Sequence, residues 1–437
     1  MKTTNVMIKS ELDMDTHWRS VIAQCCGGNI FDAPGGGYSF SAVLDKERVL
    51  DAQKVLGDPT SALCTLSIAD PAKKMPRGAI EAMVAYYDSA TFPTRYTDNN
   101  GIPGTHERLV DFLNRQHTYN TRFTFDSSCV QYSPGSIKRL LAEFLPALLF
   151  ESDVNLFFPD PSYAVIKSDI NRRDAKVIGI ALELQHDGKW LINYDAMEKQ
   201  INGKKAVLYL NVPHNPAGFT FSHFEWKNLV AWAVRNNVTV IVDEAYTHLR
   251  YDGSVSVLSV EGWQQCCIVL QSISKGWNAT GARFGWVIAH PVIIKALRKI
   301  MDVKDSGGFG PLIAGALWCL DHFEFAVKTR DEYLASHLAL NQSLSDVGFS
   351  PLMPQAGLCQ LTRAPKSADG VLFANADECA DWLRNNKRIS VMPAKVGGQA
   401  WLRWSATIAP VVECGLNDEA SVIAEVVRRL KATNFQF

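Results

Sequence analysis

The 437-residue sequence predicts an α/β protein with a large domain, whose mostly parallel seven-stranded sheet lies between helices, and a smaller α/β domain. Two observations predict this class. Apolar runs rich in Val and Ile occupy consecutive positions, which is typical of strands buried on both faces. Helical segments such as residues 223–237 separate these runs. The seven strands are expected to begin near residues 130, 154, 176, 206, 238, 267 and 284.

A change in the sequence pattern near residue 310 predicts the domain organisation. Residues 61–310 carry the alternation of strands and helices and are expected to form the large domain. Residues 311–437 form the smaller one, and residues 1–60 are expected to join it. Residues 315–348 predict one long helix or two joined helices. Further strands are expected at 357–363, 388–393 and 400–406, and further helices at 376–386 and 417–431.

Three local signals precede the first strand of the sheet. Residues 12–24 predict a short amphipathic helix. The three glycines at positions 35–37 require an unusual backbone path, which favours a structural turn over a loop that closes on a ligand. Thr105 is the expected N-cap of a helix from His106 through Arg115.

The composition excludes several classes of protein. A net charge of −1 without a Lys- or Arg-rich run argues against binding nucleic acid. No window approaches the roughly 20 apolar residues of a membrane span, and the first residues lack the apolar core of a secretory signal. The ten cysteines show no CxxC spacing, so neither a zinc site nor a disulfide scaffold is indicated. We therefore expect a cytoplasmic protein with reduced thiols and no metal site.

The sequence SISK at 272–275 ends the run that begins at residue 267. It places Lys275 beside the hydroxyls of Ser272 and Ser274, and Arg283 follows eight residues after the lysine. An amine in this setting could form a Schiff base with an aldehyde cofactor. The hydroxyls and the guanidinium could bind its phosphate through charge-assisted hydrogen bonds. The alternative is a Ser-rich turn whose Lys and Arg are solvated.

Distinctive polar residues follow other strands as well. Asn215 lies in HNPAG, and Asp243 begins DEAY after a strand. Gly135, Ser136 and Ile137 start a helix, where free backbone N–H groups form a general anion site. Ligands bind at the carboxyl ends of the strands in such sheets, so we expect these residues to converge. For Asp243 the alternative is a buried structural acceptor.

Together these motifs resemble those of the class I and II aminotransferases of the aspartate aminotransferase superfamily, fold type I enzymes that use pyridoxal 5′-phosphate. The resemblance covers roughly residues 60–410 and rests on several motifs in the same order. SISK with Arg283 is similar to the family's Schiff-base lysine motif. HNPAG is similar to its asparagine turn, with Ala217 where threonine is usual. DEAY matches the pyridine-binding aspartate and a nearby tyrosine, Tyr246.

The resemblance implies catalytic roles for Lys275, Asp243 and Tyr246. Lys275 would hold the cofactor as an internal aldimine and then act as the general base. Asp243 would keep the pyridine nitrogen protonated, so that the ring can accept electrons. Asn215 and Tyr246 would bind the phenolic oxygen of the ring, and Tyr163 would stack on the ring.

The remaining implied contacts bind phosphate and substrate. Ser272, Ser274, Arg283 and the backbone at Ser136 and Ile137 would hold the phosphate. Arg403, in WLRWS, would bind the α-carboxylate of the substrate as a bidentate fork, with Asn215 beside it. Tyr96 resembles the family's tyrosine that reaches the phosphate in the neighbouring subunit, so a homodimer is expected.

The function that the resemblance implies is transfer of an amino group between an L-amino acid and a 2-oxo acid. A lyase, cyclase or oxidase of a specialised biosynthetic pathway is the alternative, because these reactions use the same cofactor chemistry. A regulator with an aminotransferase-like domain is disfavoured, since only about 60 residues precede that domain and they contain no basic recognition helix. Asp302, Lys304 and Asp305 lie where relatives select their substrates, and an acid there predicts preference for a basic amino acid.

Overall fold

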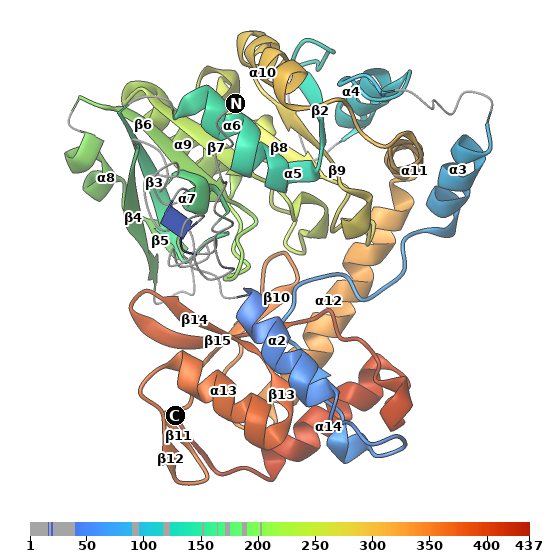
Figure 1. The fold of residues 1–437 in the computed structure, drawn as a ribbon. Coiled ribbons are helices and arrows are strands. Elements are labelled where there is room, and N and C mark those ends of the chain that lie inside the picture. Colours follow the sequence, from blue (N-terminus) through green and yellow to red (C-terminus); the bar gives the residue numbers. More distant parts are fainter. Residues whose placement is uncertain are drawn as a thin grey trace, which may run out of the picture.

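The computed structural model describes residues 16, 19–20, 40–89, 96–116, 123–150, 153–163, 165–170, 175–185, 190–201 and 203–437. The predicted helix at 12–24 lies largely outside these residues, and the turn at 35–37 lies wholly outside them. Figure 1 shows an upper body, built around one large sheet, and a lower body that contains smaller sheets.

The large sheet has eight strands among the described residues, in the order β2-β9-β8-β7-β6-β3-β4-β5. The five strands from β8 to β4 are mutually parallel, whereas β9 is antiparallel to both of its neighbours. All seven predicted strands are present. The eighth, β5, has only three residues, too few to give a pattern in the sequence, and it pairs antiparallel with the end of β4. The strands are β2 Val130–Pro134, β3 Val154–Asp160, β4 Ala175–Leu184, β5 Trp190–Ile192, β6 Lys205–Asn211, β7 Val238–Asp243, β8 Cys267–Ser272 and β9 Phe284–Ile288.

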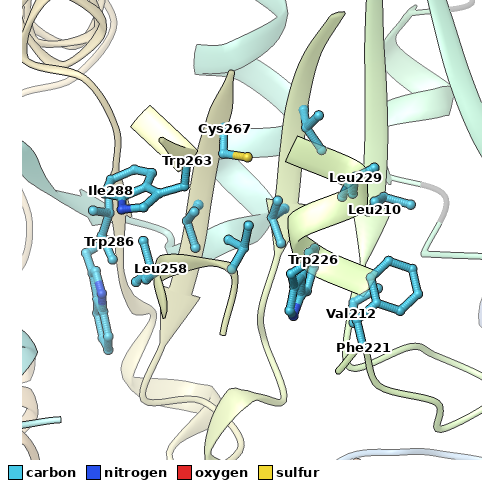
Figure 2. Packing of buried hydrophobic residues seen from close by; sticks show 14 of the residues in the cluster. Leu210, Val212, Phe221, Trp226, Leu229, Leu258, Trp263, Cys267, Trp286 and Ile288 are labelled. Atoms are coloured by element: carbon cyan, nitrogen blue, oxygen red, sulfur yellow. The ribbon is translucent and has the colours of Figure 1, made fainter. Parts of the chain in front are cut away.

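The sheet is buried on both faces because successive strand residues enter different cores. On β6, Leu208 and Leu210 belong to one apolar cluster, whereas Val207 and Tyr209 belong to the other. Figure 2 shows the first cluster, in which Trp226 packs near Val212 and Phe221. Consecutive apolar residues in the strands therefore reflect helices on both sides of the sheet.

Helices cover the two faces of the sheet, and a further set belongs to the lower body. The predicted helix at 106–115 is present, but it begins at Thr105 and its N-cap is Gly104. Thr105 is not the cap because its hydroxyl donates to the carbonyl of Ile102 at 2.7 Å. The helices around the sheet are α3 Arg77–Tyr87, α4 Thr105–Arg115, α5 Ser136–Arg139, α6 Leu145–Leu149, α7 Val165–Ile170, α8 Tyr194–Ile201, α9 His223–Arg235, α10 Pro291–Lys304 and α11 Gly310–Asp321.

The lower body contains the predicted C-terminal elements. The expected helical stretch at 315–348 is two helices, α11 and α12 Glu324–Ser345, and α12 extends from the upper body into the lower one (Figure 1). A three-stranded antiparallel sheet follows, in the order β10-β15-β14. The elements here are α2 Phe40–Asp51, β1 Cys64–Thr65, β10 Cys359–Arg363, β11 Ser367–Ala368, β12 Val371–Leu372, α13 Ala376–Lys387, β13 Ile389–Ser390, β14 Met392–Val396, β15 Gln399–Ser405, α14 Glu419–Lys431 and β16 Phe435–Gln436.

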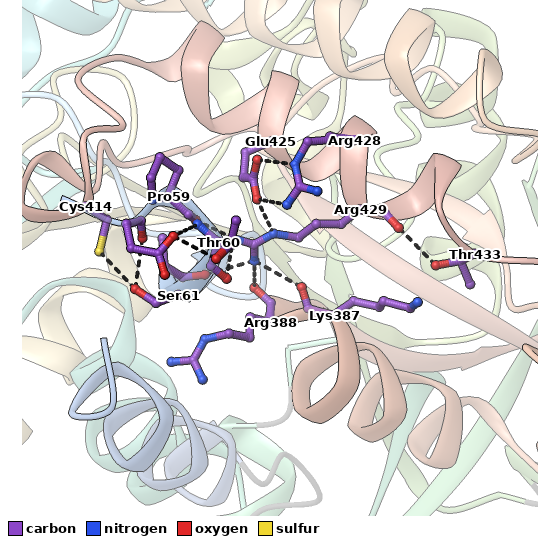
Figure 3. Close-up of polar contacts among 12 residues, drawn as sticks. Pro59, Thr60, Ser61, Lys387, Arg388, Cys414, Glu425, Arg428, Arg429 and Thr433 are labelled. Carbon is purple, nitrogen blue, oxygen red and sulfur yellow. Dashed lines mark hydrogen bonds and ion pairs between the residues drawn. The ribbon is translucent and has the colours of Figure 1, made fainter. Parts of the chain in front are cut away.

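Early residues of the chain lie against this lower body. The Lys46 ammonium on α2 is 2.8 Å from the carboxylate of Asp381 on α13, and β1 pairs in parallel with β13. Arg429 on α14 donates to the carbonyls of Pro59 and Ala62, at 2.7 and 2.8 Å. Figure 3 shows how this side chain is enclosed by carbonyl groups and by Glu425. Among the described residues, the early part of the chain as far as β1 therefore lies against the lower body, and this part includes residues beyond the predicted boundary at 60.

Candidate active site

A pocket of about 530 Å³ lies at the carboxyl ends of the central strands, a volume typical of small-molecule sites. Asn211, Asp243 and Ser272 line it, and they are the last residues of β6, β7 and β8. Every residue predicted to bind the cofactor or the substrate α-carboxylate, except Tyr96, lies in this one pocket. These residues are Ser136, Ile137, Tyr163, Asn215, Asp243, Tyr246, Ser272, Ser274, Lys275, Arg283 and Arg403.

Lys275 follows β8 and extends toward a loop that precedes α3. Its Nζ donates to the carbonyl of Ala69 at 2.8 Å and lies 3.6 Å from the carboxylate of Asp70. Burial lowers the pKa of the Lys275 amine and nearby Arg403 lowers it further, whereas Asp70 opposes the change. The fraction of neutral amine near neutral pH is therefore larger than for an ordinary lysine.

Asp243 is buried at the end of β7 and accepts two hydrogen bonds. The hydroxyl of Tyr209 donates to Oδ2 at 2.8 Å, and the N–H of Ala245 donates to Oδ1 at 3.1 Å. Burial raises the pKa of Asp243 to about 6, the neighbouring Glu244 raises it too, and the two donors oppose the rise. A cationic ring nitrogen beside this carboxylate would restore its charged form.

The start of α5 forms a close-packed end of the pocket. Gly135 and Ser136 have φ values of 83° and 65°, so the chain turns sharply at this point. A Cβ on Gly285 would lie 3.0 Å from the Cα and hydroxyl of Ser136, so a larger residue there would press on this turn. The guanidinium of Arg283 donates to the carbonyls of Thr280 and Gly135, at 2.9 and 2.7 Å.

Arg403 reaches the pocket from the lower body, because it lies in β15 between β10 and β14. Its side chain is buried. Nη1 donates to Oδ1 of Asn215 at 3.2 Å, and Nη2 donates to the carbonyl of Ser67. Asn215 is held in turn, since its N–H donates to Oδ1 of Asn211 at 2.8 Å. The guanidinium and the amide thus lie side by side.

Two tyrosines complete the wall of the pocket. Burial and the charge of Asp243 raise the pKa of Tyr163 to about 12, so its phenol is neutral at physiological pH. Tyr246 is buried a few residues after β7. An uncharged phenol can both donate and accept a hydrogen bond, which suits contact with a polar aromatic ring.

The structure separates four other predicted residues from this pocket. Tyr96 is 88% exposed. Asp302, Lys304 and Asp305 do not line the pocket of their own chain. The Asp305 carboxylate lies 2.5 Å from the guanidinium of Arg139, and Asp302 accepts from Asn99 at 3.1 Å.

Several pocket residues were missed by the sequence analysis. The loop Ile68, Ala69 and Asp70 carries no motif of its own and meets the pocket only through tertiary packing. Tyr209 does not line the pocket but contacts its residue Asp243, and it was not singled out because it lies in an apolar strand. Its phenol was a usable signal, because a buried tyrosine hydroxyl normally has a hydrogen-bond partner.

The pocket chemistry fits pyridoxal phosphate. Lys275 is a buried amine with a lowered pKa, as an aldehyde-binding lysine requires. The turn at Ser136, the hydroxyls of Ser272 and Ser274 and the guanidinium of Arg283 form a set of donors suited to phosphate. Gly285 leaves space for that turn.

Comparisons with known proteins agree with this chemistry. The family of class I and II aminotransferases matches residues 64–411. LL-diaminopimelate aminotransferase of Methanococcus maripaludis is 27% identical over 428 residues, which cover 97% of this chain and 100% of that protein. LL-diaminopimelate aminotransferase of Methanocaldococcus jannaschii is 27% identical over 430 residues, with the same coverage.

Solved structures share the fold. N-succinyldiaminopimelate aminotransferase from Mycobacterium tuberculosis has a TM-score of 0.76 at 17% identity, covering 90% of this chain and 96% of that chain. YbdL from Escherichia coli, described with a methionine aminotransferase function, has a TM-score of 0.76 at 18% identity, covering 91% and 98%.

No helix of the described residues is long and apolar enough to cross a membrane. The same residues contain no cluster of three or more His, Cys, Asp or Glu that could hold a metal ion.

The family match spans most of the chain, and the alignments with the two aminotransferases above cover the whole length of each of them. The chain therefore belongs to the class I and II aminotransferases and is a pyridoxal-phosphate-dependent transferase of amino groups.

Proposed function

We propose that Lys275, Asp243 and Arg403 are the central residues of this amino transfer, which uses an L-amino acid and a 2-oxo acid. The observation that carries the proposal is that an amine, a buried carboxylate and a guanidinium line one pocket. Bound pyridoxal phosphate supplies a ring that stabilises negative charge at the substrate Cα. The chain's own residues bind and orient the cofactor and the substrate, and they move the proton.

Lys275 is the proposed proton carrier. Its lowered pKa favours the neutral amine, which is the form that can accept the Cα proton as a general base. Asp243 would pair with the ring nitrogen of the bound cofactor, and Asn215 and Tyr246 would donate toward its phenolic oxygen. Tyr163 would pack on the ring face.

At the other end of the pocket, the phosphate is held by the turn at Ser136 and Ile137 with Ser272, Ser274 and Arg283. A fixed turn and a held guanidinium are pre-organised donors, so little ordering accompanies binding. Arg403 takes the α-carboxylate of the substrate as a fork, with the Asn215 amide beside it.

For the substrate, we propose a diamino acid such as LL-diaminopimelate. The relatives that cover the whole chain carry that substrate in their names. The pocket adds a physical reason, because the Asp70 carboxylate lines it next to Lys275 and is partly exposed. When the Lys275 amine is neutral, Asp70 is free of that ion pair and can pair with a distal ammonium on the substrate. Asp70 thus takes the role in selecting a basic amino acid that was predicted for Asp302 or Asp305.

A panel of amino donors tests this substrate class. We expect LL-diaminopimelate, lysine and ornithine to exceed norleucine and glutamate in kcat/KM. Asp70→Asn should reduce the ratio of kcat/KM for lysine over norleucine about fivefold, as expected for a partly exposed ion pair of about 1 kcal/mol. Norleucine is the matched control, since it lacks only the ammonium. A preference for glutamate, or an unchanged ratio, would refute the diamino acid assignment.

We further propose that two chains form a homodimer in which Tyr96 reaches the neighbouring pocket. Tyr96 is 88% exposed, and Tyr87 and Phe309, which contact each other edge to face, are also exposed. Gly307 lies against the backbone of Thr97, next to Tyr96, since a Cβ there would meet the Thr97 carbonyl. An exposed aromatic surface on neighbouring segments is typical of an interface.

Mixed dimers test the position of Tyr96. Tyr96→Ala and Lys275→Ala each lower the activity alone. If Tyr96 acts across the interface, a one-to-one mixture of the two variants contains hybrid dimers with one intact pocket. About a quarter of wild-type activity should then return after subunit exchange. No recovery despite proven hybrid formation would contradict the assignment.

We place the enzyme in the cytoplasm. The described cysteines are all free and all buried, which supports a reducing compartment. Fractionation of cells that express the native sequence checks this, and activity confined to the periplasm or the medium would contradict it.

A further inference from the structure

We propose that Tyr209 is a positioning residue that aims the Asp243 carboxylate at the ring nitrogen of the cofactor. The proposal rests on the function proposed above for Asp243. Tyr209 lies on β6, where the sequence pattern assigns it to the apolar core. It does not line the pocket and acts only through Asp243.

The sheet register brings the two residues together. Asn211 pairs with Asp243, and Tyr209 pairs with Ile241, which is two residues earlier on β7. Side chains two residues apart share a face of a strand, so Tyr209 and Asp243 lie diagonally on the same face. The phenol is long enough to span this diagonal, and its hydroxyl donates to Oδ2 of Asp243 at 2.8 Å.

Packing fixes the phenol in this position. Tyr209 is fully buried, and its ring stacks on Phe158 of β3 with centroids 5.6 Å apart and planes 7° apart. The backbone of Asp243 is held as well, because the side-chain amide of Asn211 donates to the Asp243 carbonyl at 3.0 Å. The carboxylate therefore has a defined orientation before any ligand arrives.

Both donors to the carboxylate are uncharged, namely the Tyr209 hydroxyl and the Ala245 N–H. A neutral donor orients a carboxylate without cancelling its charge, which leaves that charge to pair with a cationic ring nitrogen. An arginine at position 209 would neutralise it instead. Phenylalanine would pack equally well on Phe158, but without a hydroxyl it could not orient the Asp243 carboxylate.

The hydroxyl also opposes the effect of burial. Burial raises the pKa of Asp243 to about 6, and the Tyr209 hydrogen bond is the largest influence that lowers it. The other titratable groups around this pair are Glu244 beside the carboxylate and Tyr163 after β3, which also interacts with Arg283. Tyr163 and Tyr246 interact with the Tyr209 phenol. Without the hydroxyl, more of Asp243 should be protonated near neutral pH.

The test is Tyr209→Phe in the holoenzyme, which removes one oxygen atom and keeps the stacked ring. The dissociation constant of pyridoxal phosphate is measured by fluorescence between pH 5 and 8.5. At pH 7 we expect about tenfold weaker binding, and the acid midpoint of the binding curve should rise by about one pH unit. Tyr132→Phe is the matched control, since it removes another buried tyrosine hydroxyl from the same sheet, and it should change neither quantity.

Two results would overturn the proposal. One is wild-type binding with an unchanged midpoint in Tyr209→Phe. The other is weaker binding without a shift of the midpoint, which is the signature of a purely structural role. If Tyr209 acts through Asp243, adding Tyr209→Phe to Asp243→Asn should weaken binding no further. Asp243→Asn alone tests the underlying function separately, because unchanged cofactor binding there would remove the role of Asp243 itself.

Discussion

Arg429 and Arg403 are both buried arginines of the lower body, yet their surroundings differ in kind. Arg429 donates to the carbonyls of Pro59, Ala62 and Arg388 and pairs with Glu425 at 2.7 Å, all within packed protein (Figure 3). Arg403 lines the pocket. Its partners include one amide oxygen, of Asn215, and one backbone carbonyl, of Ser67.

The difference separates a cation that stabilises the fold from one that binds a ligand. Removing a buried, fully bonded charge leaves several acceptors without a donor and costs stability. Removing a charge that faces a pocket chiefly costs the interaction with the ligand. The following variants test this distinction, beginning with the largest expected effect.

Lys275→Ala should reduce kcat by about 10⁴-fold, because the proposed proton carrier is lost. The rate of amino transfer at saturating cofactor measures this. Lys275→Arg is the control, since it keeps a positive charge but cannot act as a base, and we expect a similar loss. A variant that retains a tenth of the rate would exclude Lys275 from the chemistry.

Arg429→Met should lower the free energy of unfolding by about 3–5 kcal/mol, because the carbonyls around it lose their donor. Urea unfolding measures the loss. Arg428→Met is the matched control, since that side chain is 56% exposed and shares Glu425, so it should cost less than about 1 kcal/mol. The kcat/KM of the folded fraction should stay within about twofold of wild type in both. A loss of activity without a loss of stability would reverse the comparison.

Asp243→Asn should stabilise the cofactor-free protein at high pH. The pKa of Asp243 is about 6 in the folded state against an ordinary value of 3.8, so the folded state holds this proton more tightly than the unfolded one. The stability that this group contributes is therefore present below pH 4 and lost as pH rises through 6. The variant should exceed wild type by about 3 kcal/mol at pH 8 and by almost nothing at pH 4.

Unfolding of both apo-proteins across this pH range measures the difference. Asparagine still accepts from the Tyr209 hydroxyl, so the comparison isolates the charge. A gap that does not vary with pH would mean that Asp243 is not buried in its charged form.

Arg403→Lys should lower kcat/KM about 10²-fold, mainly through KM, because an ammonium cannot form the two parallel bonds of a guanidinium. The control is a second substrate, tested with both wild type and variant. A primary amine that lacks the α-carboxylate should react equally slowly with wild type and variant. An equal drop for both substrates would show that Arg403 acts on something other than the carboxylate.

The fold and the gathering of the polar motifs could be predicted because each rests on local sequence. Consecutive apolar residues mark the strands, and the strand-end rule brings Asp243 and Ser272 together. The short strand β5 was missed, since three residues show no periodicity. Thr105 was wrongly assigned as an N-cap because its hydroxyl bonds to a residue before the helix.

Contacts between distant segments were beyond the sequence. Asp70 meets Lys275 across about two hundred positions of the chain, and no motif marks the loop that carries it. Tyr209 was not singled out, because one hydroxyl in an apolar strand carries no motif. The role of Tyr96 stays a prediction, since it concerns a second chain.

Residues 59–70 contact both arginines. Arg429 bonds to Ala62 across 367 positions, and Arg403 bonds to Ser67 across 336. One wall of the pocket is therefore synthesised early, whereas the residues that it contacts are synthesised near the end of translation. Contacts of such long sequence separation form late and slow folding. During synthesis the pocket should stay open until α14 has emerged, so premature termination before Arg403 should yield a chain unable to assemble the substrate site.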